Sequence, residues 1–326
     1  MESGFPNPLI MTHPRDQHVR DATLLTSPEL YKNVFETAER LGLRVFETST
    51  VNTPDSLEVL REEGVTAGFS LSCRSIIKRD FIRAVNGFIF NIHPSMLPAE
   101  RGGGTFSWRI LNNSKEVSAT VHVLDEGIDT GAVIVQKRTE LEKEFPTPHD
   151  YLVGTNRVYL ELLREFLSFC RQGAVPCHPQ SEEESTYLPR LYTEQNGAID
   201  WNWSDVAVER FIRAFGAPYP GAFTYAGERR FHIPEARLEP LPRPNHPFLK
   251  GRVVGFTDKG EARVFMLENM LVIPTVVVDG QSLVSADFLS VNTTLHTPWA
   301  ILAEARTAVP KVASMTSTPG KVQQEK

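Results

Sequence analysis

The sequence predicts an α/β protein in which a largely parallel sheet with helices is followed by a small antiparallel β-barrel. Over residues 8–145, short apolar runs alternate with helical stretches of about ten residues, which is typical of βαβ units. From residue 204 onward, one short helix precedes closely spaced apolar runs separated by turn residues, which is typical of antiparallel strands. A chain of 326 residues is long enough for two such domains.

Hydrophobic periodicity and helix-ending glycines predict the elements of the first domain. A helix over 30–41 has apolar residues at helical spacing and Gly42 after it, and a helix over 55–63 ends before Gly64. The strands predicted from the apolar runs are 8–11, 44–46, 66–71, 87–92 and 119–124. Strands and helices that alternate in this way predict a parallel sheet.

A long helix over 147–173 is predicted to end the first domain, because a capping threonine precedes Pro and a glycine follows the apolar periodicity. Residues 174–189 are rich in Pro, Ser and Glu, which is typical of a linker. We therefore divide the chain into a first domain at 1–173, this linker, a second domain at 190–306 and a polar tail at 307–326 that is expected to be disordered.

The second domain is predicted to start with a short helix after Ser204. The apolar runs that follow are each bounded by Gly, Pro or charged residues. They predict strands at 221–225, 230–233, 252–256, 262–267 and 272–278. This spacing favours a small antiparallel barrel.

Composition excludes several functional classes. The net charge of −6 and the pI of about 5.9 provide no basic surface for nucleic acid or anionic membranes. Cys73, Cys170 and Cys177 form neither a CxxC motif nor an even disulfide framework, which favours free thiols. No apolar run approaches the roughly 20 residues of a membrane span, and the first residues do not resemble a signal peptide. We expect a cytoplasmic protein.

The apolar strand at 87–92 leads directly into a polar turn. Asn91 and His93 are two residues apart at its end, so their side chains are expected to point to the same face. The carboxyl end of a strand in an open parallel sheet is where ligands bind. The glycines at 102–104 follow, and glycine lets a backbone approach a ligand closely. This segment is the first candidate for a functional site.

A second polar loop follows the strand at 119–124. It runs from Asp125 to Gly131 and contains Asp129, which is expected to reach His93. An amide and an imidazole can stabilise a developing oxyanion, and a carboxylate can orient the imidazole or relay a proton. The set therefore suits acyl-type transfer to an amine. The structural alternative is that His93 is a hydrogen-bonded strand-end residue and that Asp129 forms a turn.

Taken together, the two segments carry a resemblance to a known family. N-x-H-P-S-x-L-P-x-x-R-G at 91–102, followed by D-x-G-x-D-T-G at 125–131, resembles the signature of folate-dependent formyltransferases. That family includes methionyl-tRNA, glycinamide ribonucleotide and amino-sugar formyltransferases. The resemblance implies a Rossmann-like formyltransferase fold with an OB-like C-terminal domain, and it implies that Asn91, His93 and Asp129 are catalytic.

The same resemblance implies a co-substrate, 10-formyltetrahydrofolate, with its pterin beside the catalytic strand and no metal. The residues expected to contact or border the folate are Ser70, Leu71, Ser72, Arg74, Ile76, Ile77, Ser95, Leu97, Asp125, Gly127, Ile128 and Gly131. The candidates for contact with the acceptor are Arg101, Gly102, Phe106, Trp108 and Tyr219. For the aromatic candidates, packing in the core or at its rim is the alternative.

Three short segments favour a nucleotide-linked amino sugar, or another small amine, as the acceptor. Residues 11–16, 73–77 and 217–223 are similar to segments of amino-sugar N-formyltransferases. Methionyl-tRNA formylation is the runner-up, because a tRNA-binding surface needs an excess of basic residues that the second domain lacks. Hydrolysis of 10-formyltetrahydrofolate and folate binding without turnover are further alternatives. We expect that the protein can form a homodimer.

The sequence departs from the family at its start. Members of the family have a further strand and helix before the segment that corresponds to 8–12, and this sequence shows neither. The first strand of such a sheet is usually central. Its loss is therefore expected to weaken the sheet and to leave strand edges unpaired.

Overall fold

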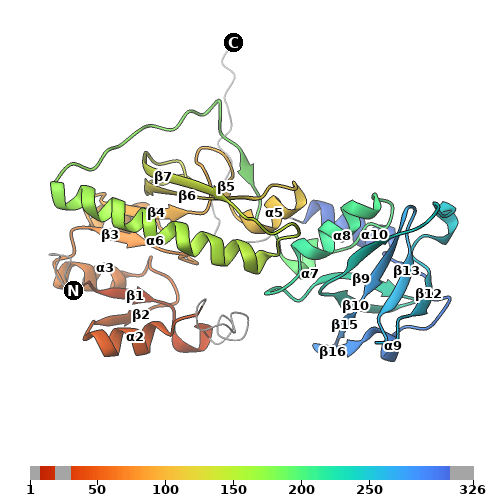
Figure 1. The fold of residues 1–326 in the computed structure, drawn as a ribbon. Helices are drawn as coiled ribbons and strands as arrows, with labels where there is room; N and C mark the ends of the chain where they lie inside the picture. The colour runs from red at the N-terminus through yellow and green to blue at the C-terminus, as the bar shows by residue number, and fades with distance from the viewer. Residues whose placement is uncertain (1–7, 19–30, 309–326) are drawn as a thin grey trace, which may run out of the picture.

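The computed structural model describes residues 8–18 and 31–308, and it shows an α/β domain followed by a β-rich domain (Figure 1). The fold class predicted from the sequence is confirmed. The tail that was predicted to be disordered spans 307–326, and its residues from 309 onward lie outside the described part of the chain.

The strands of the first domain form two main sheets. They are β1 (Ile10–Thr12), β2 (Val45–Glu47), β3 (Gly68–Ser70), β4 (Ile89–His93), β6 (Glu116–Val123) and β7 (Val133–Glu140). β1 and β2 pair in parallel, and the second sheet has the order β3–β4–β6–β7. Among the described residues no pairing joins β1 to β3.

The second sheet is mixed. β3 and β4 are parallel, whereas β4–β6 and β6–β7 are antiparallel, because β6 and β7 form a hairpin. β7 was not among the predicted strands. Because β4 and β6 are antiparallel, the loop that follows β6 begins beside the start of β4. This loop has to fold back along β4 to reach the carboxyl end of β4.

Helices cover these sheets. They are α2 (Val34–Leu41), α3 (Pro54–Glu62), α4 (Arg79–Ala84), α5 (Thr105–Leu111) and α6 (Pro148–Gln172). Thr147 and Asp150 form a capping box at the start of α6, as the sequence indicates. α2 begins later than predicted, because the Asn33 side chain caps the helix at this point. No helix within 8–18 or 31–308 has the length and apolar content that a membrane span needs.

The second domain contains two antiparallel sheets. The strands of the first sheet are, in order, β16 (Gln281–Val284), β15 (Thr275–Val278), β10 (Arg229–Ile233), β9 (Ala222–Ala226) and β17 (Leu295–His296). The strands of the second sheet are, in order, β11 (Arg237–Pro240), β14 (Asn269–Ile273), β13 (Ala262–Phe265) and β12 (Val253–Phe256). The strand predicted at 272–278 is in fact two strands in different sheets. Pro274 separates them, since proline cannot donate to a ladder.

Four short helices border these sheets: α7 (Thr193–Asn196), α8 (Asp205–Ala214), α9 (Ser285–Phe288) and α10 (Trp299–Thr307). The largest apolar core runs continuously from the first domain into the second. It includes Ile92 and Ile110 on one side and Phe211 and Ile212 on the other. A buried hydrogen bond of 2.8 Å from the Ser107 hydroxyl to the carbonyl of Ala214 fixes α5 against α8. The two domains are therefore packed together.

Candidate active site

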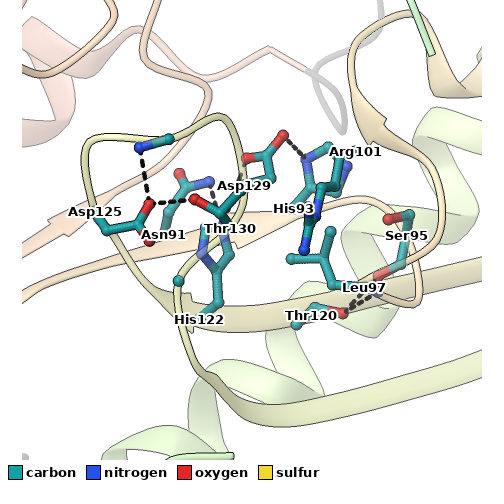
Figure 2. Close-up of polar contacts among 12 residues, drawn as sticks. Asn91, His93, Ser95, Leu97, Arg101, Thr120, His122, Asp125, Asp129 and Thr130 are labelled. Carbon is teal, nitrogen blue, oxygen red and sulfur yellow. Dashed lines mark hydrogen bonds and ion pairs between the residues drawn. The ribbon is translucent and has the colours of Figure 1, made fainter. Parts of the chain in front are cut away.

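His93 is the last residue of β4, and only 5% of it is exposed. Its Nε2–H donates to the carbonyl oxygen of Glu100 at 2.8 Å, since a carbonyl can only accept. On the other side of the ring, Nδ1 lies 3.4 Å from Oδ2 of Asp129 (Figure 2). Both neighbours are acceptors, so a doubly protonated imidazole can donate to each of them.

Asn91 lies on the same strand and faces His122 of β6 across the sheet. The His122 Nδ1–H donates to the carbonyl of Val123 at 2.8 Å, which leaves Nε2 to accept from the Asn91 amide at 3.1 Å. Burial lowers the pKa of His122, and the nearby carboxylate of Asp129 reverses only part of this shift. A neutral His122 thus orients the Asn91 amide, whose second N–H has no hydrogen-bond partner within residues 8–18 and 31–308.

His122 was not among the site residues predicted from the sequence. The register of the sheet places His122 opposite Asn91 and Thr120 opposite His93, so two polar pairs lie on neighbouring strands. The local signal is two polar residues at alternate positions within an apolar strand. Their significance depends on the pairing of β4 with β6, which the local sequence does not contain.

Asp129 lies in the loop between β6 and β7 and has a left-handed backbone with φ of 56°, which aspartate tolerates better than most residues. Its Oδ2 accepts the backbone N–H of Gly102 at 2.9 Å. Its Oδ1 lies 3.6 Å from Nε2 of His122. The carboxylate therefore lies against both histidines and the turn at Gly102, and the predicted approach of Asp129 to His93 is confirmed.

Asp125 shapes the beginning of this loop. Its Oδ1 accepts the backbone N–H of Gly127 at 3.1 Å and the hydroxyl of Thr130 at 2.6 Å (Figure 2). Asp125 and Gly127 are exposed, and Ile128 is half-buried. These three candidates for folate contact therefore lie at the surface of the loop that carries the site carboxylate.

The end of the loop is held from two sides. A Cβ on Gly131 would lie 1.8 Å from the carbonyl oxygen of Val123, so only glycine fits there. The side chain of Gln180 donates to the carbonyls of Asp129 and Gly131 at 2.8 and 2.7 Å. A residue of the predicted linker therefore fixes the backbone of the candidate site.

Arg101 is 6% exposed, and its guanidinium is occupied by the same linker. It donates to the Gln180 side-chain oxygen at 2.9 and 3.1 Å and to both carboxylate oxygens of Glu182 at 2.9 and 3.0 Å. In this structure the Arg101 guanidinium holds the linker, through a pair of residues about 80 positions away in the sequence. The contact of Arg101 with the substrate amine stays a prediction.

Gly102 connects the linker to the site. β5 (Arg101–Gly102) pairs in parallel with β8 (Tyr187–Leu188), and the Gly102 backbone has φ of 99°. A Cβ on Gly102 would lie 2.3 Å from the carbonyl oxygen of Leu188, so the close approach requires glycine. The Gly102 N–H is then free to bind Asp129, which makes this residue a support of the carboxylate.

Ser95 and Leu97 are buried in the turn after β4. The Ser95 hydroxyl donates to the carbonyl of Ala99 at 2.8 Å, and the Ser95 carbonyl accepts the hydroxyl of Thr120 at 2.6 Å. Thr120 also accepts the backbone N–H of Leu97 at 3.2 Å, and Gln136 donates to the Leu97 carbonyl at 2.7 Å. These two residues shape the turn from inside.

The segment 70–77 begins beside the site. Ser70 pairs in register with Asn91, so the end of β3 lies next to the end of β4. Leu71 is exposed (54%), and Ser72 is exposed with a positive φ of 51°. An exposed apolar side chain and a strained turn therefore lie at the edge of the sheet nearest to Asn91.

The remaining candidates of this segment differ in their surroundings. Arg74 is exposed and donates to the carbonyl of Gln17 at 3.2 Å. The Ile76 carbonyl accepts the side chain of Asn52 at 2.8 Å. The side chain of Ile77 is buried in a small apolar cluster under α3 and α4, which makes it a core residue in this structure.

The aromatic candidates do not gather at the Asn91–His93–Asp129 cluster. Phe106 stacks on Tyr151 at a ring distance of 6.2 Å and packs against the main core. The indole N–H of Trp108 donates to the carbonyl of Pro189 at 2.8 Å, and Trp108 lines a cavity between the domains. Tyr219 lies in the turn between α8 and β9 and is not part of that lining. Core and rim packing accounts for Phe106.

The cluster combines an oriented amide with a free N–H, an imidazole between two acceptors and a carboxylate fixed by a backbone N–H. Such a set can stabilise negative charge on a carbonyl oxygen and can move a proton. In the described part of the chain, no group of three or more His, Cys, Asp or Glu residues is arranged to hold a metal ion.

Comparison with known families agrees with this geometry. The formyl transferase family profile matches residues 7–149, and the profile of the formyl transferase C-terminal domain matches residues 192–291. The chain belongs to the formyltransferase family. The two matched regions correspond to the α/β domain and the β-rich domain described above.

Several solved structures share the fold of this chain. HypX from Aquifex aeolicus, in complex with tetrahydrofolic acid, superimposes with a TM-score of 0.59 at 18% identity, covering 86% of this chain and 46% of HypX. The N-formyltransferase from Helicobacter canadensis, in complex with folinic acid and dTDP-3-aminofucose, gives 0.53 at 17% identity, with 81% and 97% covered. WlaRD, a sugar 3N-formyl transferase, gives 0.52 at 18%, with 83% and 98% covered. The chain spans about half of the length of HypX.

Proposed function

We propose that this formyltransferase transfers a formyl group from 10-formyltetrahydrofolate to the primary amine of a nucleotide-linked amino sugar. The observation that carries the proposal is the convergence of Asn91, His93 and Asp129, with 3.4 Å between His93 Nδ1 and Asp129 Oδ2. The folds shared with a tetrahydrofolic acid complex and with an enzyme bound to folinic acid and an aminofucose nucleotide support the choice of donor and acceptor.

In the proposed reaction, the lone pair of a neutral amine forms a C–N bond to the formyl carbon while the bond from that carbon to folate N10 breaks. The free N–H of Asn91 and the protonated ring of His93 stabilise the negative charge that develops on the formyl oxygen. Asp129 holds His93 in place and assists transfer of the amine proton, through a water molecule, to folate N10, which leaves as neutral tetrahydrofolate. His122 and Gly102 position these groups and are not required to touch the substrate.

The proposed folate site lies between two segments that border the cluster. Ser70 is in register with Asn91, and the exposed Leu71 offers an apolar surface to a flat heteroaromatic ring. The loop at 125–131 forms the opposite border. The residues proposed to contact the folate are Ser70, Leu71, Ser72, Arg74, Ile76, Asp125, Gly127, Ile128 and Gly131. For Ser95, Leu97 and Ile77 the proposed role is limited to shaping the walls.

The proposed acceptor is a small molecule and not tRNA. The net charge of −6 gives no basic excess for the neutralisation of phosphates along an RNA. The cytoplasmic location, the homodimer and the domain limits at 173 and 190 stay predictions.

The acceptor can be identified with a panel of amines. Purified protein is incubated with 10-formyltetrahydrofolate and with a nucleotide-linked amino sugar, the free amino sugar, methionyl initiator tRNA, or no amine. We expect tetrahydrofolate release together with a nucleotide-linked product that has gained one formyl group. Formylation of tRNA alone would contradict the acceptor, and equal release without any amine would favour hydrolysis.

A further inference from the structure

A cavity of about 390 Å³ lies between the two domains, and none of the residues of the Asn91–His93–Asp129 cluster lines it. Its walls come from α5, from the chain that follows β8, from α8 and from α10, which gather at the junction of the domains (Figure 1). The residues that matter for its chemistry are Trp108, Arg190, Trp203, Arg210, Phe211 and Arg306. Its volume is within the range of about 300–1,000 Å³ that is usual for small-molecule sites.

The charge of this cavity is positive. Three arginines line it, and no carboxylate does. Arg306 is paired with the buried Asp200, and Arg190 lies over the ring of Tyr192 at 5.3 Å. Arg210 lies on α8, and no ion pair of Arg210 is found within residues 8–18 and 31–308. Guanidinium groups bind anionic oxygens strongly, so a cavity lined by three of them favours a ligand that supplies such oxygens.

The remaining chemistry of the cavity is aromatic. Trp203 packs edge to face on Phe211 at 5.0 Å, and Trp108 is held by its hydrogen bond to Pro189. Rings fixed in this way offer apolar surface to a planar group at a low cost in side-chain entropy. Organic phosphates that carry an aromatic base combine the two features that the cavity presents.

We propose that the cavity binds a nucleotide, with its phosphates at Arg210 and its base against Trp108 and Trp203. The bound nucleotide can be one of two molecules with this chemistry: the nucleotide half of the amine acceptor, or a free nucleotide that acts as an effector. Binding of the acceptor's nucleotide half rests on the proposed function. The backbone allows it, because Trp108 is at most about 16 Å from Gly102, which binds Asp129.

Binding is tested without folate, so that the result does not depend on formyl transfer. Calorimetric titrations of the full chain with UDP, ADP and uridine are carried out for the wild type, Arg210→Gln, Trp108→Leu and the exposed control Arg243→Gln. We expect a diphosphate to bind, uridine to bind at least about tenfold more weakly, and Arg210→Gln to weaken binding about tenfold to a hundredfold. Trp108→Leu should weaken it about tenfold, and Arg243→Gln should not change it.

Thermal unfolding of each variant shows whether it is folded. The proposal is overturned if neither diphosphate binds at millimolar concentration, or if folded Arg210→Gln binds as tightly as Arg243→Gln. Once an amine acceptor is known, steady-state inhibition separates the two sources. Competition between the diphosphate and the acceptor assigns the cavity to the acceptor, and an effect on kcat without competition assigns it to an effector.

Discussion

At the scale of single residues, the site depends on two histidines with different surroundings. His93 lies between two acceptors, the Glu100 carbonyl and the Asp129 carboxylate. His122 is buried, has a lowered pKa and accepts a hydrogen bond from Asn91. The ring of His93 is therefore held between two acceptors, while His122 is kept neutral so that it can orient an amide.

The lowered pKa of His122 has a consequence for stability. The unfolded chain, with a pKa of about 6.5 for this group, binds the proton more tightly than the folded chain does. The free energy of unfolding should thus be unaffected by this group above about pH 6.5 and should decrease as the pH falls below that value. In His122→Gln we expect a smaller decrease over the same range, measured by urea unfolding between pH 7.5 and 5. His149→Gln, at an exposed position, is the control, and identical pH profiles for all three proteins would contradict the assignment.

At the scale of elements, the linker after α6 is part of the site. Gln180 binds two carbonyls of the Asp129 loop, and β8 pairs with β5 next to Gly102. The geometry of the carboxylate therefore depends on a segment whose composition predicts only a flexible connection.

Removal of the Gln180 side chain should loosen that loop. Gln180→Ala loses both hydrogen bonds to the loop carbonyls, so we expect kcat to fall by about tenfold to a hundredfold, which corresponds to about 1–3 kcal/mol. Gln172→Ala removes a glutamine that bonds only to Ser168 on the exposed face of α6, and it should keep wild-type turnover. Turnover is followed by tetrahydrofolate release, and equal rates in the two variants would show that the linker does not position Asp129.

Sequence alone predicted those parts of the site that depend on local pattern. The period of two on β4 places Asn91 and His93 together, and the motif at 125–131 adds Asp129. His122, Gln180 and the engagement of Arg101 were not predicted, because each depends on contacts between segments that are far apart in the sequence. The split of 272–278 at Pro274 was within reach of sequence reasoning, since proline is rare inside a central strand.

At the scale of the whole molecule, the two domains share one core. The main apolar cluster contains residues of β6 and α6 together with residues of α8 and the second-domain sheets, and α5 is fixed to α8 by Ser107. A shared core couples the stability of one domain to that of the other. The cavity between α5, α8 and α10 is therefore enclosed by elements that do not separate easily.

This coupling predicts cooperative unfolding. We expect a single calorimetric transition in which the calorimetric and van't Hoff enthalpies agree, because both domains lose the same core at once. Differential scanning calorimetry measures both quantities. Two resolved transitions, or a calorimetric enthalpy well above the van't Hoff value, would show that the domains unfold independently.

The central claim is that Asn91, His93 and Asp129 form the centre that transfers the formyl group. Its most direct test is the single-turnover rate of tetrahydrofolate formation from 10-formyltetrahydrofolate and an accepted amine, compared between the wild type and a folded His93→Asn variant. We predict a decrease of about a hundredfold or more, since the variant lacks the imidazole ring that faces Asp129. A rate in His93→Asn that equals the wild-type rate would contradict the account.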